Sequence, residues 1–333
     1  MLLSCGDALI DFVPAKAADG RDALVPMVGG SCLNIAIGMA RLGAPVGFVG
    51  GISTDLFGRM IAGHAEASGV DLGHAVRSPR PTTLAFVRQI DGEAQYAFYD
   101  EATASRHWVY RRGSIDFAAV DAVHTGSTTL VDDPGWSQAL ALVEDAGRTT
   151  TISFDPNCRP GLVRDKAGYV RRMDRLAEHA DVVRVSDADF DYLYGGSDYG
   201  GRAKALLSAR TSLFVITRGS GGAQGWHSHA GSVTVGSPPV DVADTIGAGD
   251  SFQAGLLFAL HAMACIGPEP LRRMSVDQLR RALEFAADCA AQTCRRPGAD
   301  PPRLHELDPA SLRRLSTVAT ARASGSGAGR SRA

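Results

Sequence analysis

The chain of 333 residues has little lysine and no strong excess of either charge. Only three of its 34 lysine and arginine residues are lysines, and its formal net charge is −2. This balance gives no basic field that would attract nucleic acid. The sequence also lacks a Walker A phosphate loop and the Gly-x-Gly-x-x-Gly dinucleotide fingerprint. We therefore expect no nucleic-acid partner, and a nicotinamide-dependent dehydrogenase is poorly supported.

Cysteine and histidine are too scattered to indicate a metal site. The six cysteines show no Cys-x-x-Cys spacing, and the nine histidines form no cluster with metal-ligand spacing. Cysteines in this arrangement are typical of reduced cytosolic thiols. Leu2–Cys5 resembles the cleavage site of a lipoprotein signal peptide. No basic region precedes it, however, and there is no room before it for the apolar region of such a peptide. The apolar run Leu256–Met263 is far too short to span a bilayer. We expect a cytoplasmic protein without membrane contact.

Short apolar runs alternate with amphipathic stretches along most of the chain, whose hydrophobic content of 45% supports a large core. The runs predict buried strands at Val46–Gly50, Ala122–Thr125, Thr151–Phe154, Val182–Val185 and Leu213–Thr217. The amphipathic stretches predict helices near residues 55–68, 135–147, 166–179, 200–209 and 275–292. This alternation indicates an α/β fold with a mostly parallel sheet and helices on both faces.

Residues 82–99 depart from this pattern. Two strand-like runs flank Asp91-Gly92, which predicts a β-hairpin. An antiparallel hairpin inside an α/β pattern suggests a small second sheet. At the other end of the chain, residues 319–333 are rich in Ala, Ser, Gly and Arg without periodicity. We expect them to form a disordered tail.

The most informative stretch is a glycine-rich run that opens a strongly apolar helix. The run is Asp244-Thr245-Ile246-Gly247-Ala248-Gly249-Asp250-Ser251-Phe252. The first N–H groups of a helix have no partner within it and carry partial positive charge, and glycine lets an anion approach them closely. A carboxylate beside such an anion hole is what phosphoryl transfer to a hydroxyl needs, because it accepts the hydroxyl proton. The alternative is that Gly247 and Gly249 form a turn and that Asp250 merely caps the helix.

A second glycine-rich element lies near the N-terminus. Gly29 and Gly30 precede an apolar helix that stops at Gly43. Asn34 is a polar residue between apolar ones in the first turn of this helix. Its amide either bonds to the local backbone or binds the hydroxyl groups of a sugar.

Both elements resemble signatures of the ribokinase-like (PfkB-type) sugar kinases. Residues 244–252 are similar to the C-terminal signature of that family, and residues 29–43 to its N-terminal element, in which a Gly-Gly pair precedes an Asn and an Ala. Residues 4–14 resemble the opening strand of fructokinases, in which the second acidic residue, here Asp11, binds sugar hydroxyls. The resemblance runs from residue 2 to about residue 307 and is strongest to fructokinases.

The resemblance implies a ribokinase-like three-layer sandwich with a small β-sheet lid. The kinase domain is expected to span residues 1–318, with lid strands within about residues 8–30 and 80–112. In the family such strands cover the sugar, and in several members the lid is also a dimer surface. The implied partners are therefore a sugar, ATP and a second copy of the chain that binds through the lid.

The resemblance also assigns site residues. Asp250 is the implied general base, and the N–H groups of Gly247, Ala248 and Gly249 stabilise the transferring phosphoryl group. The implied substrate-binding residues are Asp11, Gly29, Gly30, Asn34, Asn157, Arg159 and Asp250. The implied nucleotide-binding residues are Ser186, Thr217, Gly219, Gly222, Gly247 and Gly249. Several of them follow predicted strands, where open α/β sheets bind their ligands.

Two cations are implied as well. Asp189 stands where the family commonly has a glutamate, and it would order the waters of Mg²⁺. Asp244 and the carbonyl group of Ile246 would hold K⁺ beside the anion hole. The alternatives are a first-turn acid at Asp189, which the helix dipole favours, and a turn-stabilising carboxylate at Asp244.

Fructose is the leading acceptor, because the N-terminal strand and the element Asp155–Pro160 most resemble those of fructokinases. A kinase of 2-keto-3-deoxygluconate or of another sugar is the alternative with the same fold, since Arg159 could serve an acidic sugar. A non-catalytic regulator that binds a sugar or nucleotide is the alternative from a different class. Intact Asp250 and Gly249 argue against a regulator, because a pure binder needs no general base.

Overall fold

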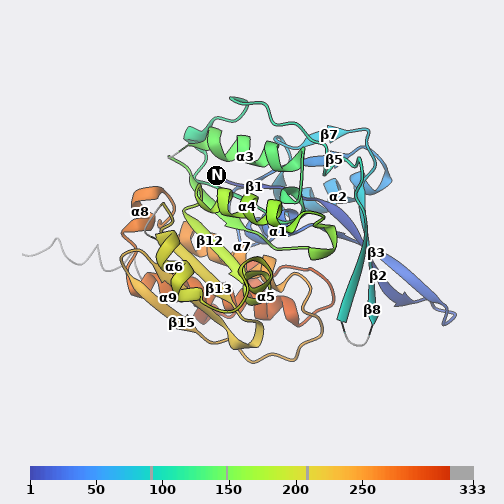
Figure 1. The fold of residues 1–333 in the computed structure, drawn as a ribbon. Helices are drawn as coiled ribbons and strands as arrows, with labels where there is room; N and C mark the ends of the chain where they lie inside the picture. The colour runs from blue at the N-terminus through green and yellow to red at the C-terminus, as the bar shows by residue number, and fades with distance from the viewer. Residues whose placement is uncertain (91–92, 148, 208–209, 316–333) are drawn as a thin grey trace, which may run out of the picture.

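The computed structural model describes residues 1–90, 93–147, 149–207 and 210–315, and a nine-stranded sheet forms its centre (Figure 1). The strand order is β15-β14-β13-β12-β11-β10-β1-β4-β6. Neighbouring strands from β13 to β6 are parallel, whereas β14 and β15 join antiparallel at one edge. The strands are β1 Leu2–Cys5, β4 Val46–Val49, β6 Val70–Asp71, β10 Ala122–Gly126, β11 Thr151–Asp155, β12 Val182–Ser186, β13 Leu213–Thr217, β14 Ala223–His227 and β15 Gly231–Val235.

Helices cover both faces of this sheet (Figure 1). Successive residues of a strand point to opposite faces. Val183 accordingly packs into a core with helices α3 to α6, whereas Val182 packs on the other side with α7 and α9. Helices α1 and α2 extend that second side over β1 and β4. The helices are α1 Ser31–Arg41, α2 Leu56–Ala67, α3 Gly135–Ala146, α4 Lys166–Ala177, α5 Asp187–Tyr194, α6 Tyr199–Leu207, α7 Ala248–Ala262, α8 Pro268–Arg272 and α9 Val276–Cys294.

Helix α7 packs closely between α1 and α9 because small residues line both contacts. A Cβ atom added at Gly38 of α1 would lie 2.7 Å from Cβ of Ala254. On the opposite side of α7, a Cβ atom at Gly255 would lie 3.0 Å from Cα of Ala286. This close packing brings the N-terminal ends of α1 and α7 together, and the candidate site lies at that point.

A separate four-stranded sheet stands out from the body of the molecule (Figure 1). Its order is β3-β2-β8-β9, in which β2 and β8 are parallel and the outer pairs are antiparallel. Phe12 and Phe86 stack across β2 and β8, with ring centroids 4.8 Å apart. The strands are β2 Leu9–Lys16, β3 Asp22–Gly29, β8 Thr83–Ile90 and β9 Glu93–Tyr99, and a two-stranded sheet pairs β5 Gly51–Ser53 with β7 Val76–Ser78.

The architecture confirms the predicted fold class, with a mostly parallel sheet, helices on both faces and a small second sheet. The five strands predicted from apolar runs correspond to β4, β10, β11, β12 and β13, and the predicted helices to α2, α3, α4, α6 and α9. The pairing of β8 with β9 confirms the hairpin, although its predicted turn at 91–92 lies outside the described residues. The predicted tail at 319–333 also lies outside them. In the described ranges, no helix is long and apolar enough to cross a membrane.

Candidate active site

Asp250 lies where the N-terminal ends of α7 and α1 meet. Gly247 precedes the helix with a left-handed backbone, φ 75°, and Asp250 follows in the first turn with only 7% of its surface exposed. Its Oδ1 accepts a hydrogen bond from Oγ of Ser31 (2.7 Å), and its Oδ2 accepts one from Nδ2 of Asn34 (2.9 Å). The two glycine-rich elements of the sequence therefore converge on one carboxylate.

Asp250 has the electrostatics expected of a proton acceptor. Burial raises its pKa to about 6, and the hydrogen bonds from Ser31 and Asn34 oppose that rise. Nδ2 of Asn157 donates to the same carboxylate at 3.2 Å. A base whose pKa lies just below neutral is ionised at neutral pH and still accepts a proton readily.

Asp11, on strand β2, lies near the Asp250 carboxylate. Burial raises its pKa to about 7, Arg159 opposes the rise, and the nearby carboxylates of Asp7 and Asp250 add to it. A Cβ atom at Gly29 of the adjacent strand would overlap Oδ2 of Asp11. The glycine therefore leaves the room that the Asp11 carboxylate occupies. The structure brings the predicted acceptor residues Asp11, Gly29 and Asp250 together.

Asn34 has a role that the sequence did not predict. Its amide donates to Asp250, whose position lies 216 residues further along the chain, rather than to the local backbone. Ser31, which the sequence analysis missed, supplies the matching bond to the other carboxylate oxygen. Asp7, also missed, accepts bonds from the Cys32 N–H (2.9 Å) and the Ser127 hydroxyl (2.8 Å). It thereby ties the start of α1 to the end of β10.

The loop after β11 contributes Asn157 and Arg159. Asn157 adopts a left-handed backbone, φ 37°, and its Nδ2 donates to Oγ of Ser31 (2.6 Å) as well as to Asp250. The Arg159 guanidinium turns back onto its own loop, where Nη1 donates to the carbonyl oxygens of Asn157 (3.2 Å) and Cys158 (3.0 Å). It remains close enough to Asp11 and Asp250 to oppose the rise in the pKa of each.

A cavity of about 650 Å³ opens at the N-terminus of α7. The predicted nucleotide residues Thr217, Gly219, Gly222 and Gly249 line it together with Ala248. The remaining lining residues come mainly from the 237–245 segment and from α9, and they are Arg184, Ser220, Ser237, Pro238, Pro239, Val240, Val242, Thr245, Phe252, Ala287, Ala290, Ala291 and Cys294. Ser186, predicted to bind the nucleotide, is not part of this lining. Its Oγ caps α5 by accepting the N–H of Asp189 (3.0 Å).

One of the three N–H groups predicted to form an anion hole has a hydrogen-bond partner within the protein. The N–H of Ala248 donates to the carbonyl oxygen of Thr245 at 3.2 Å. No backbone acceptor for the N–H groups of Gly247 and Gly249 occurs in the described part of the chain. Gly247 and Gly249, rather than all three residues, therefore have N–H groups free for an anion at the helix N-terminus.

The carboxylates predicted to serve cations have partners within the protein. Asp189 accepts the Cys158 N–H through Oδ1 (3.0 Å) and the Ser186 hydroxyl through Oδ2 (2.7 Å). Asp244 accepts the N–H groups of Ile246 (3.0 Å) and Gly298 (2.9 Å). Within residues 1–315, where described, no three His, Cys, Asp or Glu side chains cluster as an ion-binding group. The residues present thus fit a metal held mainly by its ligand's phosphates and by water, rather than by a protein cage.

Arg184 is a member of the nucleotide cavity that the sequence analysis missed. It lies in β12, is 6% exposed, and donates from Nη1 to Oδ2 of Asp155 (2.6 Å) and from Nη2 to the Thr217 hydroxyl. One signal was present in the sequence. An arginine interrupts the apolar run at 182–185, where a charged side chain is costly unless it is paired.

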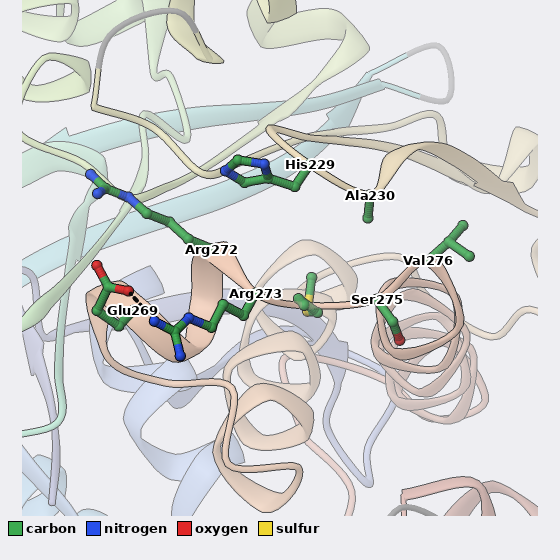
Figure 2. Close-up of a pocket in the computed structure, with 8 residues that line it drawn as sticks. His229, Ala230, Glu269, Arg272, Arg273, Ser275 and Val276 are labelled. Carbon is green, nitrogen blue, oxygen red and sulfur yellow. Dashed lines mark hydrogen bonds and ion pairs between the residues drawn. The ribbon is translucent and has the colours of Figure 1, made fainter.

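A second cavity, of about 660 Å³, lies away from all of these residues (Figure 2). It lies between the β14–β15 turn and the segment that joins α8 to α9, and the exposed Glu269–Arg273 ion pair lies at its margin. None of the predicted site residues lines it. The 650 Å³ cavity, which directly adjoins Asp250 through Ala248 and Gly249, is therefore the candidate nucleotide site.

The fold, together with a buried carboxylate at a glycine-rich helix N-terminus, is that of a kinase of the ribokinase type. Residues 1–306 match the pfkB family of carbohydrate kinases, and the chain belongs to that family. The predicted family and the prediction of a sugar kinase are therefore confirmed.

Fructokinases are among the proteins that this chain resembles. A fructokinase of Rhizobium leguminosarum bv. trifolii is 39% identical over 261 residues, which are 78% of this chain and 79% of that protein. The crystal structure of Xylella fastidiosa fructokinase with bound ATP matches with a TM-score of 0.83 at 26% identity, over 96% of this chain and 98% of that one. The Vibrio cholerae O395 fructokinase with fructose, ADP and calcium matches with a TM-score of 0.77 over 94% of this chain and 98% of that one, and at 23% identity it supports the fold alone.

Proposed function

We propose that the protein transfers the terminal phosphoryl group of ATP to a hydroxyl group of fructose. The observation that carries this proposal is the position of Asp250. Its carboxylate is near enough to that of Asp11 to raise the pKa of that group, and it directly follows Gly249, which lines the cavity. The resemblance to fructokinases at 39% identity supports fructose as the acceptor.

In the proposed reaction, Asp11 and Arg159 bind sugar hydroxyl groups, and Asp250 accepts the proton of the attacking hydroxyl. Ser31, Asn34 and Asn157 hold the Asp250 carboxylate through hydrogen bonds of 2.7, 2.9 and 3.2 Å. Such preorganisation removes the need to reorient the base during the reaction.

On the nucleotide side, the N–H groups of Gly247 and Gly249 stabilise the charge on the transferring group. The apolar part of the cavity, formed by Val240, Val242 and Ala287, receives the base of the nucleotide. When bound, Mg²⁺ would supply positive charge that lowers the cost of the charge developing on the phosphoryl group. Asp189 is the proposed carboxylate that orients its waters.

A coupled ADP-release assay over a panel of ketoses, aldoses, nucleosides and keto-acid sugars tests the assignment. We expect fructose to have the highest kcat/KM among neutral sugars. A clear preference for an acidic ketose, such as 2-keto-3-deoxygluconate, would replace fructose as the proposed acceptor. The absence of ADP release with every sugar, from a protein that binds ATP, would favour a non-catalytic regulator.

We also propose that K⁺ binds beside the anion hole through Asp244 and the carbonyl oxygen of Ile246. Asp244 already accepts the N–H groups of Ile246 and Gly298, so it ties the turn at Ile246 to the segment at Gly298. Activity should rise when a large organic cation is replaced by K⁺ at matched ionic strength. Equal rates in both salts would leave Asp244 as a turn-stabilising residue.

A homodimer through the lid is the proposed assembly. Exposed apolar side chains at Leu24 (48%) and Tyr99 (65%), which the strand register places on the same face of the four-stranded sheet, support it. Isolated exposed apolar residues are common, but two on one face of a small sheet favour an interface. Sedimentation velocity of the intact protein and of a Leu24→Glu variant tests this. A parent protein that sediments as a monomer at assay concentration contradicts the proposal.

A further inference from the structure

Arg184 is the charged side chain among the residues that line the nucleotide cavity. The others are glycine, alanine, proline, valine, serine, threonine, phenylalanine and cysteine. A nucleoside triphosphate brings several negative charges into this space. Backbone N–H groups supply only partial charges, so a full positive charge at the phosphate end would have a large effect on binding.

The guanidinium of Arg184 is held in a fixed position. Asp155 accepts from Nη1 at 2.6 Å, Thr217 accepts from Nη2, and the ring of Phe252 lies 6.0 Å from its Cζ. Asp155 ends β11 and Thr217 ends β13, so the strands on either side of β12 both orient the side chain. Three neighbouring elements thus position one cation.

That position is next to the anion hole. A Cβ atom at Gly249 would lie 3.1 Å from Nη1 and 3.2 Å from Nη2 of Arg184. The guanidinium therefore lies within contact distance of the backbone that opens α7. A phosphate at the N–H groups of this helix terminus would meet the fork of an arginine, whose geometry suits phosphate oxygens.

A purely structural role does not explain the arrangement. Nε of Arg184 is buried and has no hydrogen-bond partner in the part of the chain that the structure describes. A buried ion pair with an unused donor contributes little to stability compared with a well-packed apolar side chain. Binding of a ligand by the guanidinium would account for the free-energy cost of burying this charge and leaving its Nε–H group without a partner.

Asp155 also connects this cation to the catalytic base. Its Oδ2 binds Arg184, and its Oδ1 accepts the backbone N–H of Asn157 at 3.1 Å. The side chain of Asn157 in turn donates to Asp250. A continuous series of hydrogen bonds therefore joins the phosphate end of the cavity to the base.

We propose that Arg184 binds the phosphate groups of the nucleotide, and that Asp155 and Thr217 are positioning residues that orient its guanidinium. This inference rests on the proposed use of ATP, but it does not depend on which sugar is the acceptor. Arg184 should therefore contribute more to the affinity for a nucleoside triphosphate than to the affinity for the nucleoside.

The test is a titration of adenosine, ADP and ATP, the last two with Mg²⁺, against the parent protein and Arg184→Met in the absence of sugar. We expect the affinity for ATP to fall about tenfold to a hundredfold, as for loss of a charge-assisted hydrogen bond. The affinity for adenosine should change less than about threefold. An affinity ratio of ATP to adenosine that is unchanged in Arg184→Met overturns the proposal.

Arg184→Lys keeps the test decisive if Arg184→Met does not fold. Lysine retains the positive charge and a bond to Asp155, but it lacks the two guanidinium NH₂ groups that can bind two phosphate oxygens at once. We expect an ATP affinity between those of the parent and Arg184→Met, again with adenosine little changed. Parent-like ATP affinity together with parent-like kcat in Arg184→Lys would overturn the assigned role of the guanidinium fork.

Arg210→Met is a matched control, because Arg210 forms a part-buried ion pair with Asp181 (3.0 Å) before β12 and β13, away from the cavity. It should lower the melting temperature and leave the ratio of ATP to adenosine affinity unchanged. A ratio that falls equally in Arg210→Met and Arg184→Met would mean that general destabilisation, not phosphate binding, is the cause. If the parent binds ATP but does not phosphorylate fructose, the acceptor assignment fails while the Arg184 inference stands on the titration.

Discussion

The acceptor side of the site is held by hydrogen bonds between side chains, whereas the nucleotide side is shaped mainly by backbone and small residues. On the acceptor side, Asp250 alone accepts bonds from Ser31, Asn34 and Asn157. On the nucleotide side, glycine and apolar residues line the cavity, and Arg184 adds the charge. Side-chain networks specify the positions of individual hydroxyl groups, and a backbone cradle accepts any phosphate of the right shape. Acceptor specificity and nucleotide binding should therefore respond to different substitutions.

The sharpest test of this comparison is Asp250→Asn. The change preserves shape but removes the proton acceptor, so we expect turnover with the true substrate to fall by roughly 10²–10⁴. Nucleotide affinity, measured by titration, should be largely retained. Asp181→Asn is the control, because it alters a buried aspartate of an ion pair remote from the cavity. Near-parent turnover in Asp250→Asn would rule out its role as the base.

A pair of glycine substitutions should separate the two sides. A Cβ atom at Gly29 would overlap Oδ2 of Asp11, whereas one at Gly249 would approach the Arg184 guanidinium at 3.1 Å. Gly29→Ala should raise the KM for the sugar by about tenfold or more, and Gly249→Ala should do so for ATP, because overpacking displaces those groups. Steady-state kinetics with each substrate varied in turn measures both. If each variant affects both substrates equally, the two sides are not independent.

The pH profile examines the acceptor side alone. Burial raises the pKa of Asp250 to about 6, and only the ionised form accepts a proton. The value of kcat/KM for the sugar should therefore fall as the pH is lowered through 7 and 6, where Asp11 and Asp250 gain protons, and at pH 5 it should be at least about tenfold below its plateau. ATP affinity should change less over that interval. A flat profile of kcat/KM between pH 5 and 8 would contradict this assignment of the base.

Asp11→Ala has a smaller expected effect. A lost hydrogen bond to a neutral sugar costs about 0.5–1.5 kcal/mol, and more if its partner stays buried without a bond. The KM for fructose should rise accordingly, and that for ATP should rise less. A larger rise in the KM for ATP than in the KM for fructose would indicate that Asp11 acts on the nucleotide side of the site.

The smallest expected effect is that of Asp189→Ala. Because Asp189 is proposed to act on Mg²⁺ through water, the variant should need several-fold more Mg²⁺ for half-maximal rate. Its fold should persist, since the hydrogen bonds that the carboxylate accepts from the Cys158 N–H and the Ser186 hydroxyl are only part-buried. Asp187→Ala, which changes the other acid in the same helical turn, serves as the control. An unchanged Mg²⁺ requirement would indicate that the nucleotide holds the metal ion without help from Asp189.

The sequence predicted those parts of the site that have a local signature. Buried parallel strands were recognisable as short apolar runs, and the residues of the anion hole as glycines before an apolar helix. The partners of those residues had no such signature. Ser31 and Asn34 bond to Asp250 across 219 and 216 residues of chain, and no periodicity encodes that contact. Arg184 was missed because its neighbours are apolar and its partners, Asp155 and Thr217, belong to other strands.

The packing of α1 against α7 has a consequence for how activity arises during synthesis. Asp250 receives its hydrogen-bond donors only after a segment near residue 250 has emerged and docked on a helix that begins at Ser31. Contacts of such high sequence separation require a long loop to close before they are gained. A nascent or truncated chain that ends before α7 thus carries the four-stranded sheet and Asp11 but lacks Asp250, the proposed base. Under the proposed mechanism, turnover therefore requires a chain in which α7 has docked on α1.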